Sequence, residues 1–219
     1  MTYLPESMYN TRQIMPRKTK EEAEKTRSRI LANALTLFVK KGYENTTFID
    51  IASRLKLTKG AVYWHFDSKA GLLAALIEEA TKRFSCALRQ HMEGREMTFP
   101  AVAEMLVEMA KQIISDRSRA DFFMLMLTGV KWTDARLAQL TRKLIEERSG
   151  PYHAVVDALT ADIEAGRVSA STDVLSLATT VISIWDGVIR RKIEGFLTSD
   201  VATTLDIAFS LVWNGIRTP

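Results

Sequence analysis

The residues best suited to chemistry lie in the stretch TKGAVYWHF, residues 58–66. It places three aromatic rings, a histidine and a lysine around a glycine and an alanine. Small residues at the start of a helix let its backbone approach a large partner closely. Tyr, His and Lys side chains can donate hydrogen bonds to phosphate oxygens. This combination favours the binding of a nucleic acid.

Enzyme chemistry is disfavoured by the rest of the sequence. It contains no His-Glu-x-x-His, no Gly-x-Ser-x-Gly and no glycine-rich phosphate loop. The histidines His65, His91 and His153 are scattered, and adjacent carboxylates such as Glu146 and Glu147 are typical of a solvated helix face. We therefore expect no catalytic residues, no cofactor and no metal ion.

The composition indicates a globular protein of a reducing compartment. Cys86 is the only cysteine, which excludes a disulfide framework. The first residues lack the apolar core of a signal peptide. The longest apolar run, residues 174–185, is shorter than the ~20 residues that span a bilayer. We expect a cytoplasmic protein with no membrane partner.

The charge is spread unevenly along the chain. Residues 1–69 hold 13 Lys and Arg against 7 Asp and Glu, whereas residues 70–219 hold 17 against 19. A basic first third followed by a mildly acidic remainder suggests a polyanion-binding head on a body with another task. A solubilising basic tail is the alternative explanation.

Helical periodicity runs through the whole chain and predicts an all-α fold of about nine helices. Gly42 supplies a stop for the first helix. Thr46 or Thr47 can cap the second helix, Thr58 the third and Ser68 the fourth. The expected helices cover approximately residues 20–41, 47–55, 58–66, 68–93, 100–115, 119–130, 134–165 with a break at Gly150-Pro151, 173–195 and 201–214.

The second and third of these helices are short, closely connected and braced by the longer first helix, as in a helix-turn-helix. In that motif the second short helix lies in the major groove with its first residues near the base edges. Val62 and Phe66 are then expected to face the core, and Tyr63 and His65 to face phosphates. We expect Trp64 to lie with them on the DNA side. The alternative is that Tyr63, Trp64 and Phe66 fill the junction between helices, which we expect for Phe66 and in part for Trp64.

The same region carries a series of short motifs in a specific order. They are Thr26 to Leu31 with Ala34 and Phe38, Gly42-Tyr43, Thr46-Thr47, Ile51-Ala52, Lys59 to Phe66, and Ser68-Lys69. Over residues 16–69 they resemble the DNA-binding domain of the tetracycline-repressor (TetR) family of bacterial regulators. The Tyr-Trp-His-Phe motif is similar to that of the AcrR-type subgroup, which represses multidrug-efflux pumps. The resemblance implies a homodimeric repressor that binds a palindromic operator and responds to a small ligand.

The resemblance also implies which residues contact DNA. Thr47, Tyr63, His65 and Lys69 match positions that contact phosphates, and Thr58, Lys59 and Gly60 match positions at the base edges. The chain departs from the family at Lys56, where glycine is usual, and at Ala70 and Gly71, where acidic residues are usual. The complete set of candidate DNA-binding residues is Thr47, Lys56, Thr58, Lys59, Gly60, Tyr63, Trp64, His65 and Lys69.

The expected organisation has three parts. Residues 1–15 form an N-terminal extension that we expect to be disordered. Residues 16–69 form the helix-turn-helix domain, and residues 70–219 form a helical domain for effector binding and dimerisation. The helix expected at 68–93 belongs to both domains, so it can report ligand occupancy to the DNA-binding head.

The last two helices are apolar on more than one side, which indicates burial against more than one partner. A four-helix bundle formed with a second copy of the chain explains this pattern, and a purely internal core is the alternative. The expected interface residues are Val181, Trp185, Val188, Leu205, Phe209 and Val212.

Six of the nine methionines fall between residues 92 and 126, close to several aromatic residues. Methionine suits surfaces that accept varied apolar partners, and an apolar cavity of at least ~300 Å³ would indicate a small-molecule site. Without such a cavity, an architectural DNA-binding dimer that needs no effector is the alternative. Asp186, the one acid in its apolar row, is either a counter-ion for a cationic ligand or a residue at the solvent edge. The candidate ligand-binding residues are Phe84, Met105, Met109, Phe122, Phe123, Met126, Trp132, Ile182, Asp186 and Ile189.

Overall fold

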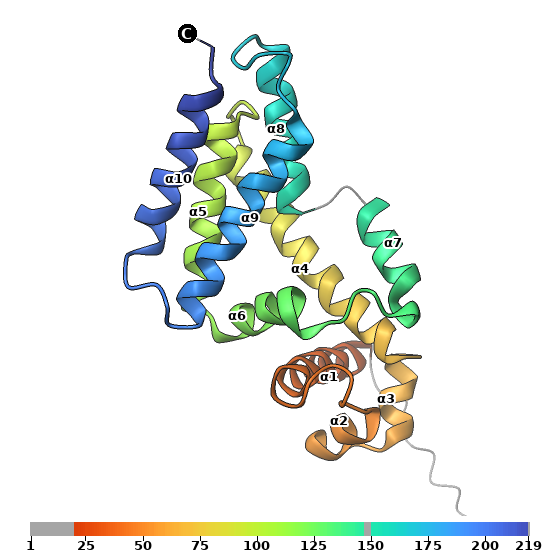
Figure 1. Ribbon diagram of the computed structural model, residues 1–219. Helices are drawn as coiled ribbons and strands as arrows, with labels where there is room; N and C mark the ends of the chain where they lie inside the picture. Colours follow the sequence, from red (N-terminus) through yellow and green to blue (C-terminus); the bar gives the residue numbers. More distant parts are fainter. Residues whose placement is uncertain (1–19, 147–149, 219) are drawn as a thin grey trace, which may run out of the picture.

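A computed structural model describes residues 20–146 and 150–218 as an assembly of helices (Figure 1). It confirms the all-α class, with ten α-helices in these described ranges where about nine helices were expected. Within the described residues no helix is long and apolar enough to cross a bilayer. The predicted extension, residues 1–15, lies outside the described part. The helices are α1 Lys20–Lys41, α2 Phe48–Leu55, α3 Lys59–His65, α4 Lys69–Met92, α5 Phe99–Ser115, α6 Arg117–Met124, α7 Ala138–Glu146, α8 Pro151–Glu164, α9 Val174–Ile193 and α10 Val201–Ile216.

Two short turns of other helical types connect α6 to α7. Leu125–Gly129 forms a π-helical turn, and Ala135–Leu137 forms a 3-10 turn. A Cβ atom at Gly129 would lie 2.8 Å from Leu125 Cδ1, so a larger residue here would require the Leu125 side chain to shift. Isolated π-helical turns are rare and occur frequently at functional sites.

Helices α1, α2 and α3 form the head at the bottom of Figure 1. Ile30, Ala34 and Phe38 lie three to four residues apart on α1, and all three are buried. They pack in one hydrophobic cluster with Phe48 and Ile51 of α2. The helical spacing read from the sequence therefore accounts for the packing of the head.

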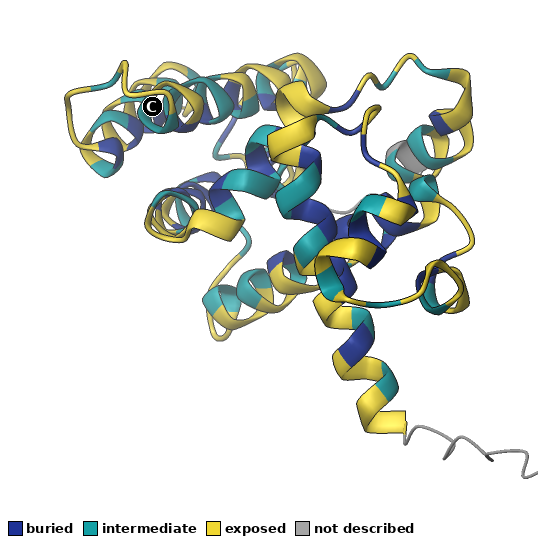
Figure 2. Ribbon diagram, turned by 90° about the horizontal axis from the view of Figure 1, so that it is seen from below, coloured by how far each residue is buried: buried dark blue, intermediate teal, exposed yellow. Residues whose placement is uncertain are grey.

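The upper part of the molecule is a bundle of α5, α8, α9 and α10 (Figure 1). Helix α4 runs from the head up to this bundle, and α6 lies across the space between the bundle and α1. Figure 2 shows that buried residues follow the inward side of the helices and exposed residues the outward side. Helices α4 and α6 are therefore the elements through which head and body meet.

A buried carboxylate fixes one end of the bundle. The Asp162 side chain of α8 is fully buried and accepts a hydrogen bond from the backbone N–H of Phe99 at 2.7 Å. Its other oxygen accepts from Arg167 Nε at 2.6 Å. The carboxylate thus satisfies an N–H group at the start of α5 while its charge is paired.

The hydrophobic core is divided into two clusters, and the division does not follow the order of the chain. The body cluster joins α5, α8, α9 and α10. The head cluster joins α1, α2 and the first half of α4, but it also takes in Leu125, Val130 and Leu137. The connection between α6 and α7 therefore packs with the head, although its residues were assigned to the body from the sequence.

Candidate DNA-binding surface and ligand pocket

The short helix α3 is held by two apolar anchors. Val62 is fully buried and Phe66 is nearly so, which confirms their predicted core positions. Arg27 of α1 places its guanidinium 5.2 Å from the centroid of the Phe66 ring. Because these two anchors fix the inner side of α3, the opposite side is presented outward.

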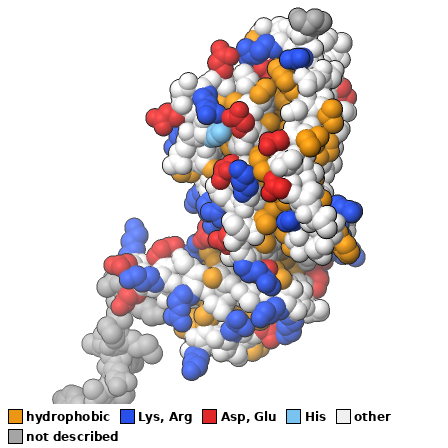
Figure 3. Space-filling view, turned by 90° about the vertical axis from the view of Figure 1, so that its left-hand side faces the viewer, with side chains coloured by type: hydrophobic (Ala, Val, Ile, Leu, Met, Phe, Trp, Pro, Cys, Tyr) orange, Lys and Arg blue, Asp and Glu red, His pale blue; other side chains and the backbone are white. Residues whose placement is uncertain are grey.

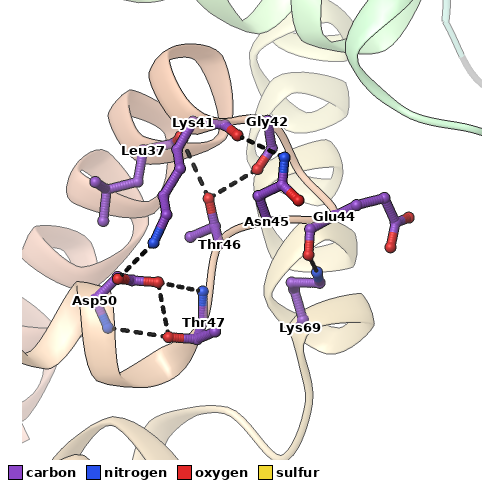
Figure 4. Close-up of polar contacts among 9 residues, drawn as sticks. All are labelled: Leu37, Lys41, Gly42, Glu44, Asn45, Thr46, Thr47, Asp50 and Lys69. Carbon is purple, nitrogen blue, oxygen red and sulfur yellow. Dashed lines mark hydrogen bonds and ion pairs between the residues drawn. The ribbon is translucent and has the colours of Figure 1, made fainter.

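Caps at the start of α2 and α3 position the candidate contact residues. Thr47 accepts from the Asp50 backbone N–H at 3.2 Å, and the Asp50 carboxylate accepts from the Thr47 N–H at 2.8 Å, completing a capping box (Figure 4). Hydrogen bonding from Lys41 and Thr47 lowers the pKa of Asp50 to about 2, so the box holds its charge. Thr58 caps α3 by accepting from Ala61 N–H at 3.1 Å, which leaves the exposed Lys59 at the first turn.

The connection between α2 and α3 uses a lysine in a backbone conformation that favours glycine. Lys56 caps the end of α2 with φ 55° and ψ 38°, in the left-handed region. Its backbone N–H donates to Ser53 C=O at 3.2 Å, and the Leu57 N–H donates to Ala52 C=O at 2.9 Å. The turn is therefore formed as in a glycine-containing connection, with an exposed lysine side chain added.

A small hollow beside α3 collects three of the predicted phosphate-contacting residues. It has a volume of about 230 Å³ and includes the side chains of Thr47, Tyr63 and Lys69 in its lining. Ser68, also in the lining, caps α4 by accepting from the Gly71 N–H at 3.0 Å. Hydroxyl and ammonium donors at the start of a long helix suit a phosphate group.

Lys69 has a structural task that the sequence did not reveal. Its ammonium donates to the backbone carbonyl of Glu44 at 2.9 Å (Figure 4) and to that of Tyr43 at 2.7 Å. It also lies 4.5 Å from the centroid of the Tyr43 ring. Burial lowers the pKa of Lys69. The residue therefore ties the start of α4 to the loop between α1 and α2.

Trp64 corrects one sequence-based expectation. Its side chain is 74% exposed and does not fill the junction between helices. Its ring meets the His65 ring edge-on, with centroids 4.6 Å apart. Tyr63 is 46% exposed and packs edge-on against Phe48, and the Lys59 ammonium lies 5.4 Å from the Tyr63 ring centroid. The outward side of α3 is thus aromatic and basic.

A pocket of about 630 Å³ lies between α4, α5, α6, α7, α8 and α9. Eight of the ten candidate ligand-binding residues line it: Phe84, Met109, Phe122, Phe123, Met126, Trp132, Ile182 and Asp186. Met105 and Ile189 do not line it, since both are buried in the body core. The volume exceeds the ~300 Å³ that separates a small-molecule site from packing defects.

Phe84 is the one residue of α4, α7 and α8 that the sequence placed in the wall, and the rest of their contribution was not predicted. On α4, Ile77, Thr81 and Phe84 follow one another at helical spacing, a signal that could have shown their common face. No comparable signal marked α7 and α8. The other residues that complete the wall include Ala80, Ile113, Leu127, Thr141, Leu144, Tyr152, His153 and Trp185.

Two polar groups stand out in this apolar wall. Burial raises the pKa of Asp186 to about 6, because little water solvates its charged form. Thr141 Oγ1 is buried and has no hydrogen-bond partner among the described residues. A buried polar group without a partner carries a cost of about 1–3 kcal/mol, which a ligand's polar group can relieve.

Most of the predicted dimer-interface residues belong to the protomer's own core. Those assigned wrongly are Val181, Trp185, Leu205 and Phe209, which are all buried within the body cluster. Trp185 also donates from Nε1 to the Leu106 carbonyl at 2.8 Å. Val188 and Val212 are half-buried at the edge of the same cluster. These residues face inward, because α9 packs against α5 and α8, and α10 packs against α5 and α9.

Comparison with known proteins agrees with this geometry. A family model for bacterial regulatory proteins of the tetR family matches residues 30–76. The transcriptional regulator TtgR of Pseudomonas putida is 28% identical over 186 residues, which cover 81% of this chain and 84% of TtgR. Residues 30–76 therefore form a DNA-binding domain of the tetR family type. AcrR of Shigella flexneri is 45% identical to this chain over 64 residues, 29% of this chain and 30% of AcrR.

Two solved structures have the same fold as this chain over most of its length. NalD of Pseudomonas aeruginosa superposes with a TM-score of 0.70 at 18% identity, covering 90% of this chain and 98% of NalD. FadR of Bacillus subtilis superposes with a TM-score of 0.72 at 16% identity, covering 86% and 98%. The regulators that the chain resembles in sequence bind DNA and are not enzymes.

Proposed function

We propose that the protein is a dimeric repressor that leaves a palindromic operator when a small apolar or amphipathic molecule occupies the pocket. The pocket of about 630 Å³ carries this proposal. Its wall includes Ile77 and Phe84 of α4, and the same helix begins at Lys69 beside the exposed side of α3. A ligand in the pocket therefore contacts the helix that enters the DNA-binding head.

The proposed dimer rests on an exposed apolar face of α9 and α10. Leu175 is 61% exposed, and Ile207 and Leu211, four residues apart on α10, are 58% and 70% exposed. Figure 3 views the side of the molecule that carries α10, and hydrophobic side chains are visible there over the body. Lys and Arg side chains gather over the head on the same side. A second copy covering the apolar face would orient both heads toward one DNA duplex.

Such a two-fold dimer presents two copies of α3 to DNA. Half-sites of a palindromic operator are read about one helical turn apart, ~34 Å, or a multiple of it. In each half-site, Lys59 and Gly60 at the first turn of α3 would face base edges. Thr47, Tyr63 and Lys69 would hold the phosphates beside them.

Control of an efflux pump is proposed from the relatives. NalD is described as the secondary repressor of the MexAB-OprM multidrug efflux pump. A protein of Escherichia coli, 43% identical over 58 residues, is named a probable acrEF/envCD operon repressor. A roomy pocket with flexible Met109 and Met126 in its wall suits the varied apolar compounds that such pumps export.

The proposal is tested with an operator duplex enriched by the protein from a random-sequence library. Operator affinity is measured by fluorescence anisotropy with and without a panel of neutral and cationic aromatic compounds. A true effector should weaken operator binding by roughly 5- to 150-fold, the usual range of such couplings. Thr81→Trp, which places a large ring in the pocket, should reduce compound binding by about tenfold or more. Compounds that fill the pocket without changing operator affinity would favour an effector-independent DNA-binding dimer.

A further inference from the structure

The pocket lies at the boundary between the two hydrophobic clusters of the molecule. On one side its wall is built from residues of the body cluster, including Phe84, Phe123 and Trp185. On the other side it is built from Ile77 of the head cluster and from Met126 and Trp132, which pack against that cluster. A molecule in the pocket therefore contacts both clusters at once.

The connecting segment, which we define as residues 125–137, forms much of the head side of this wall. Its residues Met126, Leu127 and Trp132 line the pocket, and the Trp132 indole N–H donates to the Met126 carbonyl at 3.0 Å. Leu125 and Val130 of the same segment are buried in the head cluster. One face of the connecting segment thus meets the ligand space and the other meets the head.

The connecting segment also reaches the head through an ion-pair network. Arg136 donates from Nη2 to the Asp134 carboxylate at 2.6 Å and to the Glu44 carboxylate at 2.7 Å. A second bond joins Arg136 Nε to Asp134 at 3.0 Å, and hydrogen bonding by Arg136 lowers the pKa of Asp134 to about 2. Glu44 lies in the loop between α1 and α2, far from Arg136 in the sequence.

The Glu44 loop is the one that Lys69 holds. Lys69 donates to the carbonyls of Tyr43 and Glu44, and its side chain lines the small hollow with Thr47 and Tyr63. Burial, followed by the charge of Glu44, raises the pKa of Tyr43 to about 12. The charged groups of Arg136, Glu44 and Lys69 therefore lie close together around the Glu44 loop, at the edge of the proposed DNA-binding surface.

We infer that Arg136 is a positioning residue for DNA binding: through Glu44 it links the pocket-lining connecting segment to the loop that holds Lys69. This rests on the proposed ligand release. Displacement of Trp132 by a ligand moves the connecting segment, and the Arg136–Glu44 pair transmits that movement to the phosphate-binding groups. The pair supplements the path along α4 and the apolar contacts of Leu125 and Val130.

The size of the effect follows from exposure. The side chains of Arg136 and Glu44 are 70% and 41% exposed, so water screens their attraction. An exposed pair of this kind typically changes an equilibrium by no more than about fivefold. Breaking the pair should therefore lower the coupling between ligand and DNA by about two- to fivefold, with the fold intact.

The first measurement uses N-phenylnaphthylamine, a neutral aromatic fluorophore, as the pocket probe. The affinity of the protein for an enriched duplex is measured with and without saturating probe. Arg136→Gln and Glu44→Gln should each lower the probe's effect on duplex affinity by about two- to fivefold, and the double variant should lower it no further. Arg95→Gln is the matched control, because Arg95 makes an exposed ion pair with Glu104 at 2.9 Å outside this path. Unchanged coupling in Arg136→Gln would overturn the inference.

The second measurement needs no ligand. Binding of the enriched duplex should slow amide hydrogen exchange in the connecting segment of the wild type, and Glu44→Gln should reduce that slowing by about two- to fivefold. Failure of the duplex to protect the segment in the wild type would also overturn the inference. The probe could also bind without changing duplex affinity while the duplex still protects the segment and Glu44→Gln still weakens that protection. This result would reject ligand release by that probe but would support the Arg136–Glu44 link.

Discussion

The Lys69 ammonium donates to the backbone carbonyl of Tyr43 at 2.7 Å and lies 4.5 Å from the centroid of that residue's ring. With a second bond to the Glu44 carbonyl, two of its three N–H donors are used inside the protein. One donor remains for a phosphate in the hollow beside α3. Lys69 therefore combines a task in the fold of the head with its proposed task at the DNA.

Lys69→Met should affect both stability and DNA binding. Loss of a charged donor to two carbonyls should lower the free energy of unfolding by about 1–3 kcal/mol. Loss of one phosphate contact should reduce the slope of log affinity against log salt by about one. Urea unfolding and titrations at several salt concentrations measure the two effects separately.

Lys59→Met is the control for this variant. The Lys59 ammonium lies over the Tyr63 ring on an exposed helix turn, and none of the hydrogen bonds described for the head depends on it. Its loss should leave unfolding unchanged and alter which duplexes are preferred. A Lys69→Met protein as stable as the wild type would contradict the bracing role, and an unchanged salt slope would contradict the phosphate contact.

Lys56→Gly should separate the backbone of the turn from its side chain. The left-handed conformation of Lys56, φ 55°, costs a non-glycine residue about 1–2 kcal/mol, and glycine adopts it freely. After the greater flexibility of glycine in the unfolded chain is allowed for, we expect the variant to be about 0.5–1 kcal/mol more stable.

DNA affinity should change in the opposite direction if the Lys56 side chain contacts phosphate. The variant would then bind all duplexes more weakly and with a smaller salt slope, despite its higher melting temperature. Lys56→Asn serves as the comparison, since asparagine tolerates the left-handed region and also lacks the charge. Full affinity in both variants would remove Lys56 from the DNA-binding residues.

Local sequence signals predicted much of this structure. The spacing of Ile30, Ala34 and Phe38 gives the core of the head, and Thr47 and Thr58 act as the caps that the sequence suggested. These features depend on neighbours a few residues away. They are therefore visible without knowledge of the tertiary packing.

The signals fail where two apolar rows on one helix compete. On α9 and α10 the sequence shows apolar residues on more than one side, but only the packed bundle decides that Val181 and Leu205 are buried within the protomer. The sequence also showed no sign of contacts between residues that lie far apart along the chain. The Asp162 contact with Phe99 joins residues 63 positions apart, and the Lys69 contact with Tyr43 joins residues 26 apart.

Leu211→Asp should dissociate the proposed dimer. Leu211 is 70% exposed in the protomer, so the substitution leaves the protomer core intact but places a charge on the apolar face of α10. At micromolar concentration we expect sedimentation to change from a dimer to a monomer. An unpaired charge in an interface typically costs several kcal/mol.

Ile49→Asp is the matched control for assembly. Ile49 is a 57% exposed apolar residue on α2 of the head, away from α9 and α10. It should sediment like the wild type. A Leu211→Asp protein that remained dimeric would place the interface on another surface.

The buried carboxyl group of Asp186 should make the stability of the protein depend on pH. Its folded pKa of about 6 lies above the ordinary value of 3.8, because burial disfavours the charged carboxylate. An acid with a raised folded pKa contributes stability that is fully present below its unfolded pKa and is lost as pH rises through the folded pKa. The wild type should therefore lose stability relative to Asp186→Asn between about pH 4 and 6. Because the side chain keeps some contact with water, we expect the difference to change by about 1–2 kcal/mol, measured by urea unfolding.

Ligand charge should reverse this pH trend. Tetraphenylphosphonium, a permanent cation, favours the ionised carboxylate, so its affinity should rise as pH increases through about 6. Neutral N-phenylnaphthylamine gains no such attraction, and its affinity should stay level or fall. In Asp186→Asn both probes should lose their pH dependence over this range. A cation that binds the variant as tightly as the wild type at neutral pH would exclude Asp186 as its counter-ion, while a change in operator affinity on binding would still uphold the pocket as the effector site.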